Sequence, residues 1–530
     1  MRRGLWWSVA ALAVAAALRP TPVASQVSAS GSFSAYGEAY DHSGGGNPAR
    51  PVNTGRITAN LTLSLFHGLV SAPLTALIST DQVSFRQQIN QIGVSPTYKS
   101  VTFHAGWFNP NYSTYTIADA TVLGGGIDVA PDGGRVRVGG LYGRARKAVT
   151  PGFNVTSQAQ WARWMTGGHA GFGDLNGSFL DLFVVRTEDK AGGIDTVGVS
   201  FLPPIEATTV AGAKGQLGLG RVQLLLEAAS SRHTRQDTAS FAAVTAQAGS
   251  AKLLYRAATW SFGVTSEYVG PGFTTLGNSG LAGDRLDVGL TGSAQVAGGK
   301  LMLRGTGGWR RNNLKGDLSA TTTQAIYNVG GSWQPSPTVG VDWQVSNNVN
   351  NNKAKDDTSS IKNITGVYNV TPRFSWRTGA VQHVLVVVGS IQRTQNTSPL
   401  SVTLLDTKTS LAVATWSAAL PSAITLTATA TYTRVELDTL GESTITTVAP
   451  GLAAGLFARK VQVQLQAQFM HATNPAGQSE KEVYPLIQIG YAVAAGQNLV
   501  LKSTVRHHEF SNTNSFDERI VSLQYSASFR

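Results

Sequence analysis

Apolar and polar residues alternate along most of the chain after residue 26. In KVQVQLQAQF, residues 460–469, four glutamines alternate with valine, leucine, alanine and phenylalanine. In SAITLTATATYT, residues 422–433, threonines alternate in the same way with apolar residues. Successive side chains of a β-strand point to opposite faces, so each segment predicts a strand with one apolar and one polar face.

Twenty-six such segments can be traced, from residues 27–40 to residues 516–529, and the count falls toward 22 if the weaker segments are left out. Short connections rich in turn-forming residues, such as PDGG at 131–134, alternate with longer polar ones, such as residues 147–166. This alternation predicts an all-β fold, a transmembrane antiparallel up-and-down β-barrel of about 26 strands. An even strand number places both termini at one rim, which we expect to be periplasmic.

The composition favours a membrane barrel over a soluble β-sandwich. Charged residues make up only 14% of the chain, against roughly 25% in ordinary soluble domains. The hydrophobic residues, 42% of the total, are dispersed along the strands. This composition suits a barrel wall whose apolar face contacts lipid and whose polar face contacts water.

The first 25 residues have the layout of a secretory signal peptide. Arg2 and Arg3 precede an apolar run over residues 5–18, and small residues follow at 23–25. The run is shorter than the roughly 20 residues that a spanning helix needs. We therefore expect cleavage, which leaves residues 26–530 as the barrel.

Several function classes have no support in the sequence. The chain contains no cysteine, which excludes thiol catalysis and cysteine metal sites. Its net charge of +12 is spread along many strands, so no basic patch predicts nucleic-acid binding. No strand–helix nucleophile elbow is present, and His507 and His508 are adjacent, so they should point to opposite faces rather than share a metal. We expect neither an enzyme nor a cofactor.

These features together resemble the bacterial outer-membrane β-barrel proteins. The last segment ends in SLQYSASFR, and in that class a final strand with a terminal aromatic is the signal read by the periplasmic barrel-assembly machinery. Tyr525 and Phe529 match this pattern, and Arg530 departs from it. The resemblance implies an outer-membrane location, with membrane lipid and lipopolysaccharide as surroundings. We expect the apolar face of this strand to meet lipid and its edge to pair with residues 27–40.

A narrower resemblance covers roughly the first half of the chain. Residues 90–129, followed by GRVRVGGLYGRARKAV, look like a group of large barrels from Bacteroidetes-type bacteria. TonB-dependent transporters differ, because they carry a plug of more than a hundred residues before the first strand. Here strands begin at residue 27 and no long irregular segment follows, so we expect no plug domain.

The residues expected to carry function are basic side chains facing the lumen and two loop tryptophans. A charge on the lipid face costs about 2–4 kcal/mol at the membrane midplane, so basic residues that alternate with apolar ones should face inward. The lumen candidates are Arg135, Arg137, Arg304, Arg310, Lys502 and Arg506. Trp161 and Trp164 fall in a long loop, where they either reach into the lumen or anchor the loop at the membrane surface.

Rings of arginine or lysine favour anions, and the alternative is that these cations pair with nearby carboxylates and select nothing. The sequence therefore predicts a passive pore or transporter for small polar or anionic solutes. A structural or assembly barrel, whose extracellular loops bind a partner or glycan, is the other hypothesis.

Overall fold

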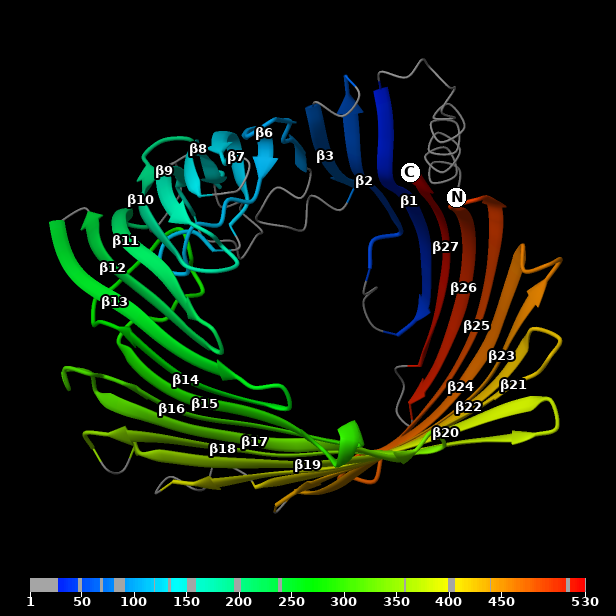
Figure 1. Ribbon diagram of the computed structural model, residues 1–530. Coiled ribbons are helices and arrows are strands. Elements are labelled where there is room, and N and C mark those ends of the chain that lie inside the picture. The colour runs from blue at the N-terminus through cyan, green and yellow to red at the C-terminus, as the bar shows by residue number, and fades with distance from the viewer. Residues whose placement is uncertain are drawn as a thin grey trace.

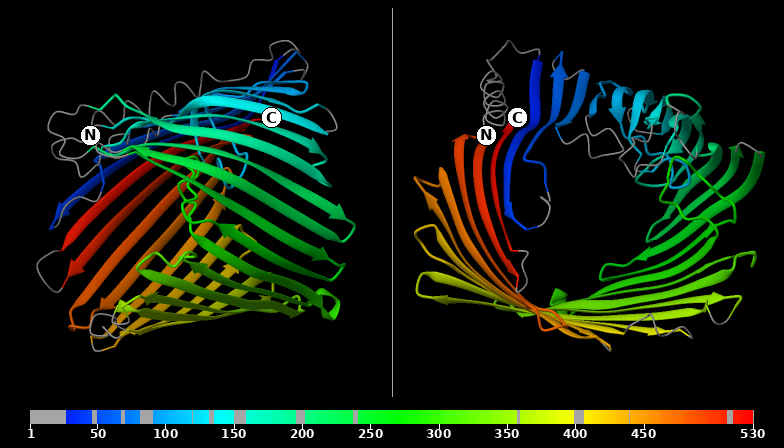
Figure 2. Two further views of the ribbon diagram at one scale, coloured as in Figure 1. Left: turned by 90° about the vertical axis from the view of Figure 1, so that its left-hand side faces the viewer. Right: turned by 180° about the vertical axis from the view of Figure 1, so that it is seen from behind.

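A single antiparallel sheet closes on itself in the computed structural model (Figure 1). The structure describes residues 27–45, 50–66, 70–80, 91–118, 120–131, 135–149, 159–194, 202–236, 241–356, 359–398, 406–438, 440–510 and 515–529. The expected signal peptide lies outside these residues. The strands run obliquely around the wall (Figure 2).

The sheet contains 27 strands, and a one-turn 3₁₀ helix at Ala297–Gly299 joins two of them. The strands are β1 (Val27–Gly44), β2 (Asn53–Leu65), β3 (Val70–Ser79), β4 (Gln91–Val94), β5 (Thr97–Tyr98), β6 (Val101–Phe108), β7 (Val122–Val129), β8 (Val136–Arg146), β9 (Ala162–Gly173), β10 (Phe179–Lys190), β11 (Ile205–Leu219), β12 (Val222–Gln236), β13 (Phe241–Arg256) and β14 (Trp260–Val269). They continue with β15 (Arg285–Val296), β16 (Leu301–Asn312), β17 (Ala320–Ser336), β18 (Val339–Ala354), β19 (Ile361–Thr378), β20 (Val381–Thr397), β21 (Thr407–Ala419), β22 (Ile424–Leu437), β23 (Gly441–Leu456), β24 (Val461–Thr473), β25 (Ser479–Ala494), β26 (Gln497–Phe510) and β27 (Phe516–Phe529).

The wall has 26 positions, as predicted, because β4 and β5 are two halves of one strand. Both pair with β3 on one side and β6 on the other. The break falls at Ser95 and Pro96, and proline has no N–H to donate to the ladder. Pro73 lies within β3 and accepts a hydrogen bond from the Ser95 N–H at 2.9 Å, so its carbonyl still joins the two strands.

The first and last strands close the barrel. Their antiparallel register runs from Gly31 opposite Phe529 to Gly44 opposite Phe516. Figure 1 shows β1 (blue) directly beside β27 (red). The predicted pairing of the two ends of the barrel is confirmed, and every strand edge in the wall has a partner.

The outer face of the wall is apolar. On β10, Leu180, Leu182 and Val184 are about half exposed, whereas Phe183 and Val185 are buried on the inner side. No helix among the described residues is long and apolar enough to cross a membrane.

Aromatic side chains gather on the outer face near the short connections. The Trp376 ring stacks on His383 with centroids 5.1 Å apart, and Trp416 lies 5.9 Å from the other face of the same imidazole. Tyr255 and Trp260 make a similar contact at 4.8 Å. Aromatic girdles of this kind mark the membrane interface in barrels.

Gly31 provides a test of the closing seam. Its φ of +139° suits glycine, and a Cβ at this position would lie 2.2 Å from the Asn60 carbonyl oxygen on β2. We expect Gly31→Ala to cost about 1–3 kcal/mol and to reduce the folded fraction, because β1 cannot then lie flat between β2 and β27.

The folded fraction can be measured by heat-modifiable migration on gels. Gly340→Ala is the matched control, since the nearest atom to its Cβ is 3.9 Å away. Equal folded fractions for the two variants would contradict a strained, tightly packed seam.

Candidate functional site in the lumen

Two connections fold into the interior of the barrel, beside β6 to β14 (Figure 1). One joins β6 to β7 and the other joins β14 to β15. The Thr275 hydroxyl donates to the Thr116 carbonyl at 2.9 Å, and the Asn278 amide donates to the Thr114 carbonyl at 2.8 Å. The two connections therefore form one body, which we call the lumenal insert (residues 109–118 and 270–284).

The insert is held against the wall by an apolar core inside the barrel. Tyr115 and Ile117 are almost completely buried, and Phe273 meets Tyr115 edge-on at 5.8 Å. They cover apolar side chains on the inner face of β8 to β13, namely Leu141, Met165, Phe183, Val185, Val210, Ala229 and Ala248. Burial of a side chain such as Ile117 contributes about 1.5–3 kcal/mol, so this core fixes the insert in place.

Polar contacts fix the orientation of the insert. Ser113 donates to the Glu227 carboxylate on β12, and the Lys214 ammonium donates to the Tyr112 carbonyl. The Tyr115 hydroxyl donates to Glu267 on β14 at 3.2 Å. Burial raises the pKa of Tyr112 and of Tyr115 well above the usual range, so both phenols stay neutral and able to donate.

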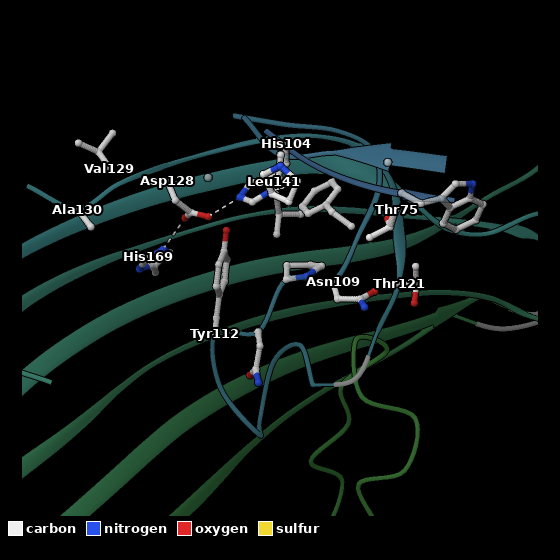
Figure 3. A pocket seen from close by; sticks show the side chains of 18 of the residues that line it. Thr75, His104, Asn109, Tyr112, Thr121, Asp128, Val129, Ala130, Leu141 and His169 are labelled. Atoms are coloured by element: carbon white, nitrogen blue, oxygen red, sulfur yellow. Dashed lines mark hydrogen bonds and ion pairs between the residues drawn. The ribbon is translucent and has the colours of Figure 1, made fainter. Parts of the chain in front are cut away.

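A cavity of about 520 Å³ lies between the insert and the wall formed by β3 to β9 (Figure 3). Its polar centre is Asp128, whose two oxygens lie 2.9 Å from His104 Nε2 and 3.0 Å from His169 Nε2. The Tyr112 ring packs against the His169 ring in a tilted arrangement, with centroids 4.7 Å apart. The insert thus closes one side of a pocket that the wall provides with two imidazoles and one carboxylate.

Ser95 extends this network, because its hydroxyl lies 2.8 Å from His104 Nδ1. Serine, histidine and aspartate in a row are the parts of a hydrolytic triad, and such a site also needs N–H donors for an oxyanion. The Ser95 N–H already donates to Pro73, and Asp128 is shared with a second imidazole. We interpret the chain of hydrogen bonds as a structural network that joins β6, β7 and β9 to the break between β4 and β5.

Two glycines make room for the charged bridges on the inner face. Gly171 lies directly between Arg137 and Asp181 across β8, β9 and β10, and a Cβ there would lie 1.8 Å from Asp181 Oδ1. Gly139 likewise lies between Asp128 and His169, and a Cβ there would lie 2.0 Å from Asp128 Oδ1. Each bridge therefore crosses a strand whose intervening residue must lack a side chain.

Three of the six predicted basic residues are held by carboxylates on the inner wall. Arg137 is buried and donates to Asp181 at 2.7 Å. Arg310 forms a two-pronged pair with Asp287, at 2.6 and 2.9 Å.

Arg506 contacts Glu482 at 2.8 Å and Glu518 at 3.3 Å. The partners Asp181, Asp287, Glu482 and Glu518 could not be assigned from sequence, because each lies on another strand and the strand register was unknown.

The other three predicted basic residues have different surroundings. Arg304 is exposed and Lys502 is half-buried, and neither has an ion-pair partner within the described parts of the chain. Arg135 is exposed in the connection just before β8, outside the strand in which the sequence pattern placed it.

The prediction that Trp164 lies in a loop is wrong. β9 begins at Ala162, so Trp164 is a strand residue, and its ring stacks on Tyr142 of β8 at 5.3 Å. The strand starts early because Arg163, on the inner face, pairs with Asp189 of β10 at 2.7 and 2.8 Å.

Trp161 does lie in the connection, where it is buried and donates to the Pro203 carbonyl at 2.8 Å. The two tryptophans therefore share no site.

A metal could be considered at Glu480, Glu482 and His508, whose ligand atoms lie within 4.8 Å of one another. His508 faces inward between these carboxylates, whereas His507 pairs with Asp517, so the predicted opposite orientation of the two histidines is confirmed. The Arg506 guanidinium already binds Glu482. A cation in that position would face a fixed positive charge, so the group fits an ion-pair network better than a metal centre.

The lumenal insert was missed by the sequence analysis, which considered the long loop with Trp161 and Trp164, within residues 147–166, as a segment that might reach into the lumen. Residues 150–158 of that loop lie outside the described part of the chain. The available signal was NPNYSTYTI at 109–117, where two tyrosines and an isoleucine occur in a segment without strand alternation. Large apolar residues in a long connection indicate a buried rather than a solvated loop.

The closed antiparallel wall, apolar outside and polar within, defines a transmembrane-type β-barrel. No family model and no curated protein matches the chain. Similar solved structures include OccAB2 of Acinetobacter baumannii, with 12% identity, a TM-score of 0.31, and coverage of 62% of this chain and 93% of that chain.

They also include a BenF-like porin of Pseudomonas fluorescens Pf-5, with 11% identity, a TM-score of 0.32, and coverage of 67% of this chain and 100% of that one. OccK5 (OpdH) of Pseudomonas aeruginosa is similar at 13% identity, a TM-score of 0.32, and coverage of 68% and 100%. The assignment of the fold rests on the strand register of this chain, not on these likenesses.

Gly171 allows a test of the bridged wall. We expect Gly171→Ala to lower the stability of the barrel by about 1–3 kcal/mol, because the added methyl group displaces the Arg137–Asp181 pair. The midpoint of urea unfolding measures this change. Gly307→Ala is the control, since its Cβ would meet no atom within 4 Å. A loss of stability as large in the control would rule out a specific effect on the pair.

Proposed function

We propose that the protein is an outer-membrane pore through which small polar solutes pass passively, with both termini in the periplasm. The observation that carries the proposal is the closed wall, apolar outside and polar inside, with an insert that occupies one side of the lumen. Barrel diameter grows with strand number, and 16–18 strands already leave an aqueous channel. A wall of 26 positions therefore has room for both the insert and a water-filled path.

On β22 to β24, opposite the insert, the inner face carries uncharged side chains, many of them polar. A hydrogen bond between the Thr415 and Thr429 hydroxyls places the threonine ladder of β22 on the inner face. The register continues this face to Gly451 of β23 and Gln466 of β24. Hydroxyl and amide groups suit hydrated neutral solutes, because they offer both donors and acceptors without fixed charge.

The finer proposal, a preference for anions, rests on the cations that have no carboxylate beside them. Of the six predicted residues, Arg304 and Lys502 meet this condition within the described parts of the chain, whereas Arg137, Arg310 and Arg506 are neutralised. Arg377 on the inner face of β19 also has no ion-pair partner there. The preference should be modest, since single charges on distant strands do not form a ring. We assign no catalytic step to the lumen.

The proposal also covers how the barrel is assembled and which bacteria it resembles those of. Tyr525 and Phe529 lie on β27 at the closing seam, and the Tyr525 ring lies 6.4 Å from Phe33 of β1. A terminal aromatic strand in this position supports recognition by barrel-assembly machinery. The likeness of residues 90–129 to barrels of Bacteroidetes-type bacteria also stays a proposal.

Planar-bilayer recording tests the pore and the role of the insert. Wild-type protein should form stable channels, and Tyr115→Ala with Ile117→Ala should raise the unitary conductance and its fluctuations. Each truncation costs about 2–5 kcal/mol of packing, which releases the insert from the wall.

The matched control removes the same two residue types from the lipid face, at Tyr368 and Ile391, which are cross-strand neighbours on β19 and β20. Electrical silence of the wild type would reject the pore and favour a barrel that binds a partner or glycan through its loops. Unchanged conductance in the insert variant would reject the idea that the insert narrows the pore.

Ion selectivity tests the second part of the proposal. In a salt gradient, we expect the wild type to show a small reversal potential in the direction of anion preference. Arg304→Gln with Lys502→Gln should reduce it, because two of the unneutralised lumen charges are gone. Arg311→Gln with Lys353→Gln removes two charges from the outer face and should leave the potential unchanged. A potential that is the same in all three proteins would exclude these two residues as its source.

A further inference from the structure

A basic patch lies on the outer face of four consecutive strands, near the ends that carry the long connections. It consists of Lys353 on β18, Lys362 on β19, Arg393 on β20 and Lys408 on β21, and all four side chains are exposed. These four strands contain one carboxylate, Asp342. We call this group the outer basic patch.

The strand register shows that the patch faces away from the lumen. The inner face can be followed from the insert across the wall: Glu267, which contacts the insert, is opposite Asp287, and Asp287 pairs with Arg310. Arg310 is opposite Gln324, and Gln324 bonds to Asn348 at 3.1 Å.

Asn348 is opposite Thr365, whose hydroxyl bonds to that of Thr394 at 3.2 Å. Residues adjacent in sequence to inner residues point outward. Arg393 precedes Thr394 and therefore lies on the lipid-facing side, and the same alternation places Lys353, Lys362 and Lys408 there.

The charges of the patch are poorly compensated by the protein. Arg393 is directly opposite Lys408 in the register, so two like charges are cross-strand neighbours, an arrangement that is destabilising. Lys408 also contacts Glu436 at 3.2 Å, but that carboxylate is shared with Arg434. Lys353, Lys362 and Arg393 have no ion-pair partner within the described residues.

The inner wall of the same barrel is arranged in the opposite way. There Arg137, Arg163, Arg285, Arg310 and Arg506 each contact at least one carboxylate. The chain therefore neutralises these five lumenal arginines, whereas in the outer basic patch only Lys408 contacts a carboxylate among the described residues. An anion from the surroundings would offset the repulsion between Arg393 and Lys408.

The position of the patch relative to the membrane follows from the aromatic stack on the same strands. Arg393 and His383 share the outer face of β20, and His383 is sandwiched between Trp376 and Trp416. Ten residues at about 3.3 Å each, tilted by about 45°, span about 23 Å along the membrane normal. This is close to the height of a barrel's apolar band, about 25 Å. The patch and the stack thus lie at opposite membrane surfaces.

We propose that the outer basic patch binds the phosphate groups of lipopolysaccharide, the phosphorylated glycolipid of the outer leaflet. The inference rests on the proposed outer-membrane location. Neighbouring strands lie about 4.8 Å apart and Lys362 is four residues along β19 from the position opposite Arg393, so the four cations extend over more than about 14 Å. A wide headgroup with several phosphates can contact more than one strand across that distance, which a single phospholipid phosphate cannot. Binding would place the rim with the long connections in the outer leaflet.

The test compares thermal unfolding of the purified barrel in neutral detergent, with and without purified lipopolysaccharide. Lys362→Gln, Arg393→Gln and Lys408→Gln are combined in one variant. The matched control combines Arg304→Gln, Arg373→Gln and Arg377→Gln, which removes the same number of charges from the inner face. We expect lipopolysaccharide to raise the unfolding midpoint of the wild type and the control, and to raise that of the patch variant by less than half as much.

Three results would overturn the proposal. They are no midpoint shift in the wild type, a full shift in the patch variant, and an equal shift with phosphatidylglycerol, which would show that any anionic lipid suffices. Without lipid, the patch variant should be at least as stable as the wild type, because the opposed pair is gone. A fall in that midpoint would contradict the repulsion on which the inference depends.

Bilayer recording separates this inference from the proposed pore. The patch variant should conduct like the wild type, since its changes lie outside the lumen. A conducting wild type without a lipopolysaccharide shift rejects the lipid site alone. A shift in a protein that does not conduct rejects the pore alone.

Discussion

The pairing of every strand edge in the wall is the constraint on which the rest of this structure depends. In lipid there is no water to satisfy backbone N–H and C=O groups, so a sheet with a free edge could not remain there. The seam between β1 and β27 removes the last edge, with a register that runs from Gly31 opposite Phe529 to Gly44 opposite Phe516. The break at Ser95 and Pro96 is tolerated because β3 and β6 still hold both halves of that strand.

Closure leaves the two faces of the wall with different electrostatic conditions. On the inner face, arginines are bridged to carboxylates across intervening glycines, as at Arg137, Gly171 and Asp181. Such charge-assisted hydrogen bonds lock neighbouring strands together where the lumenal insert limits access of water. On the outer face, basic side chains near one rim have few protein partners, which leaves them available to an external anion. Basic side chains therefore stabilise the wall on one face and are available for binding on the other.

Much of the wall was predictable from sequence, because alternation depends only on the solvent that each residue meets. The polar and apolar faces of β22 and β24, the count of 26 wall positions and the pairing of the two ends are confirmed. Trp164 was misplaced because QWARWM does not alternate simply: Arg163 is paired inside while Trp164 stacks outside. The lumenal insert was missed because its partners, Glu227 and Glu267, are more than a hundred residues away from Ser113 and Tyr115.

The sequence by itself determined the class of fold and the order of strands around the wall, since both follow from a period of two and from short turns. Only the tertiary structure decided which cations are neutralised and which are not. Arg310 and Arg304 have the same sequence pattern, yet one faces Asp287 and the other faces no described carboxylate. That difference arises from strand register, because the neighbour across a strand is set by alignment of two backbones rather than by local sequence.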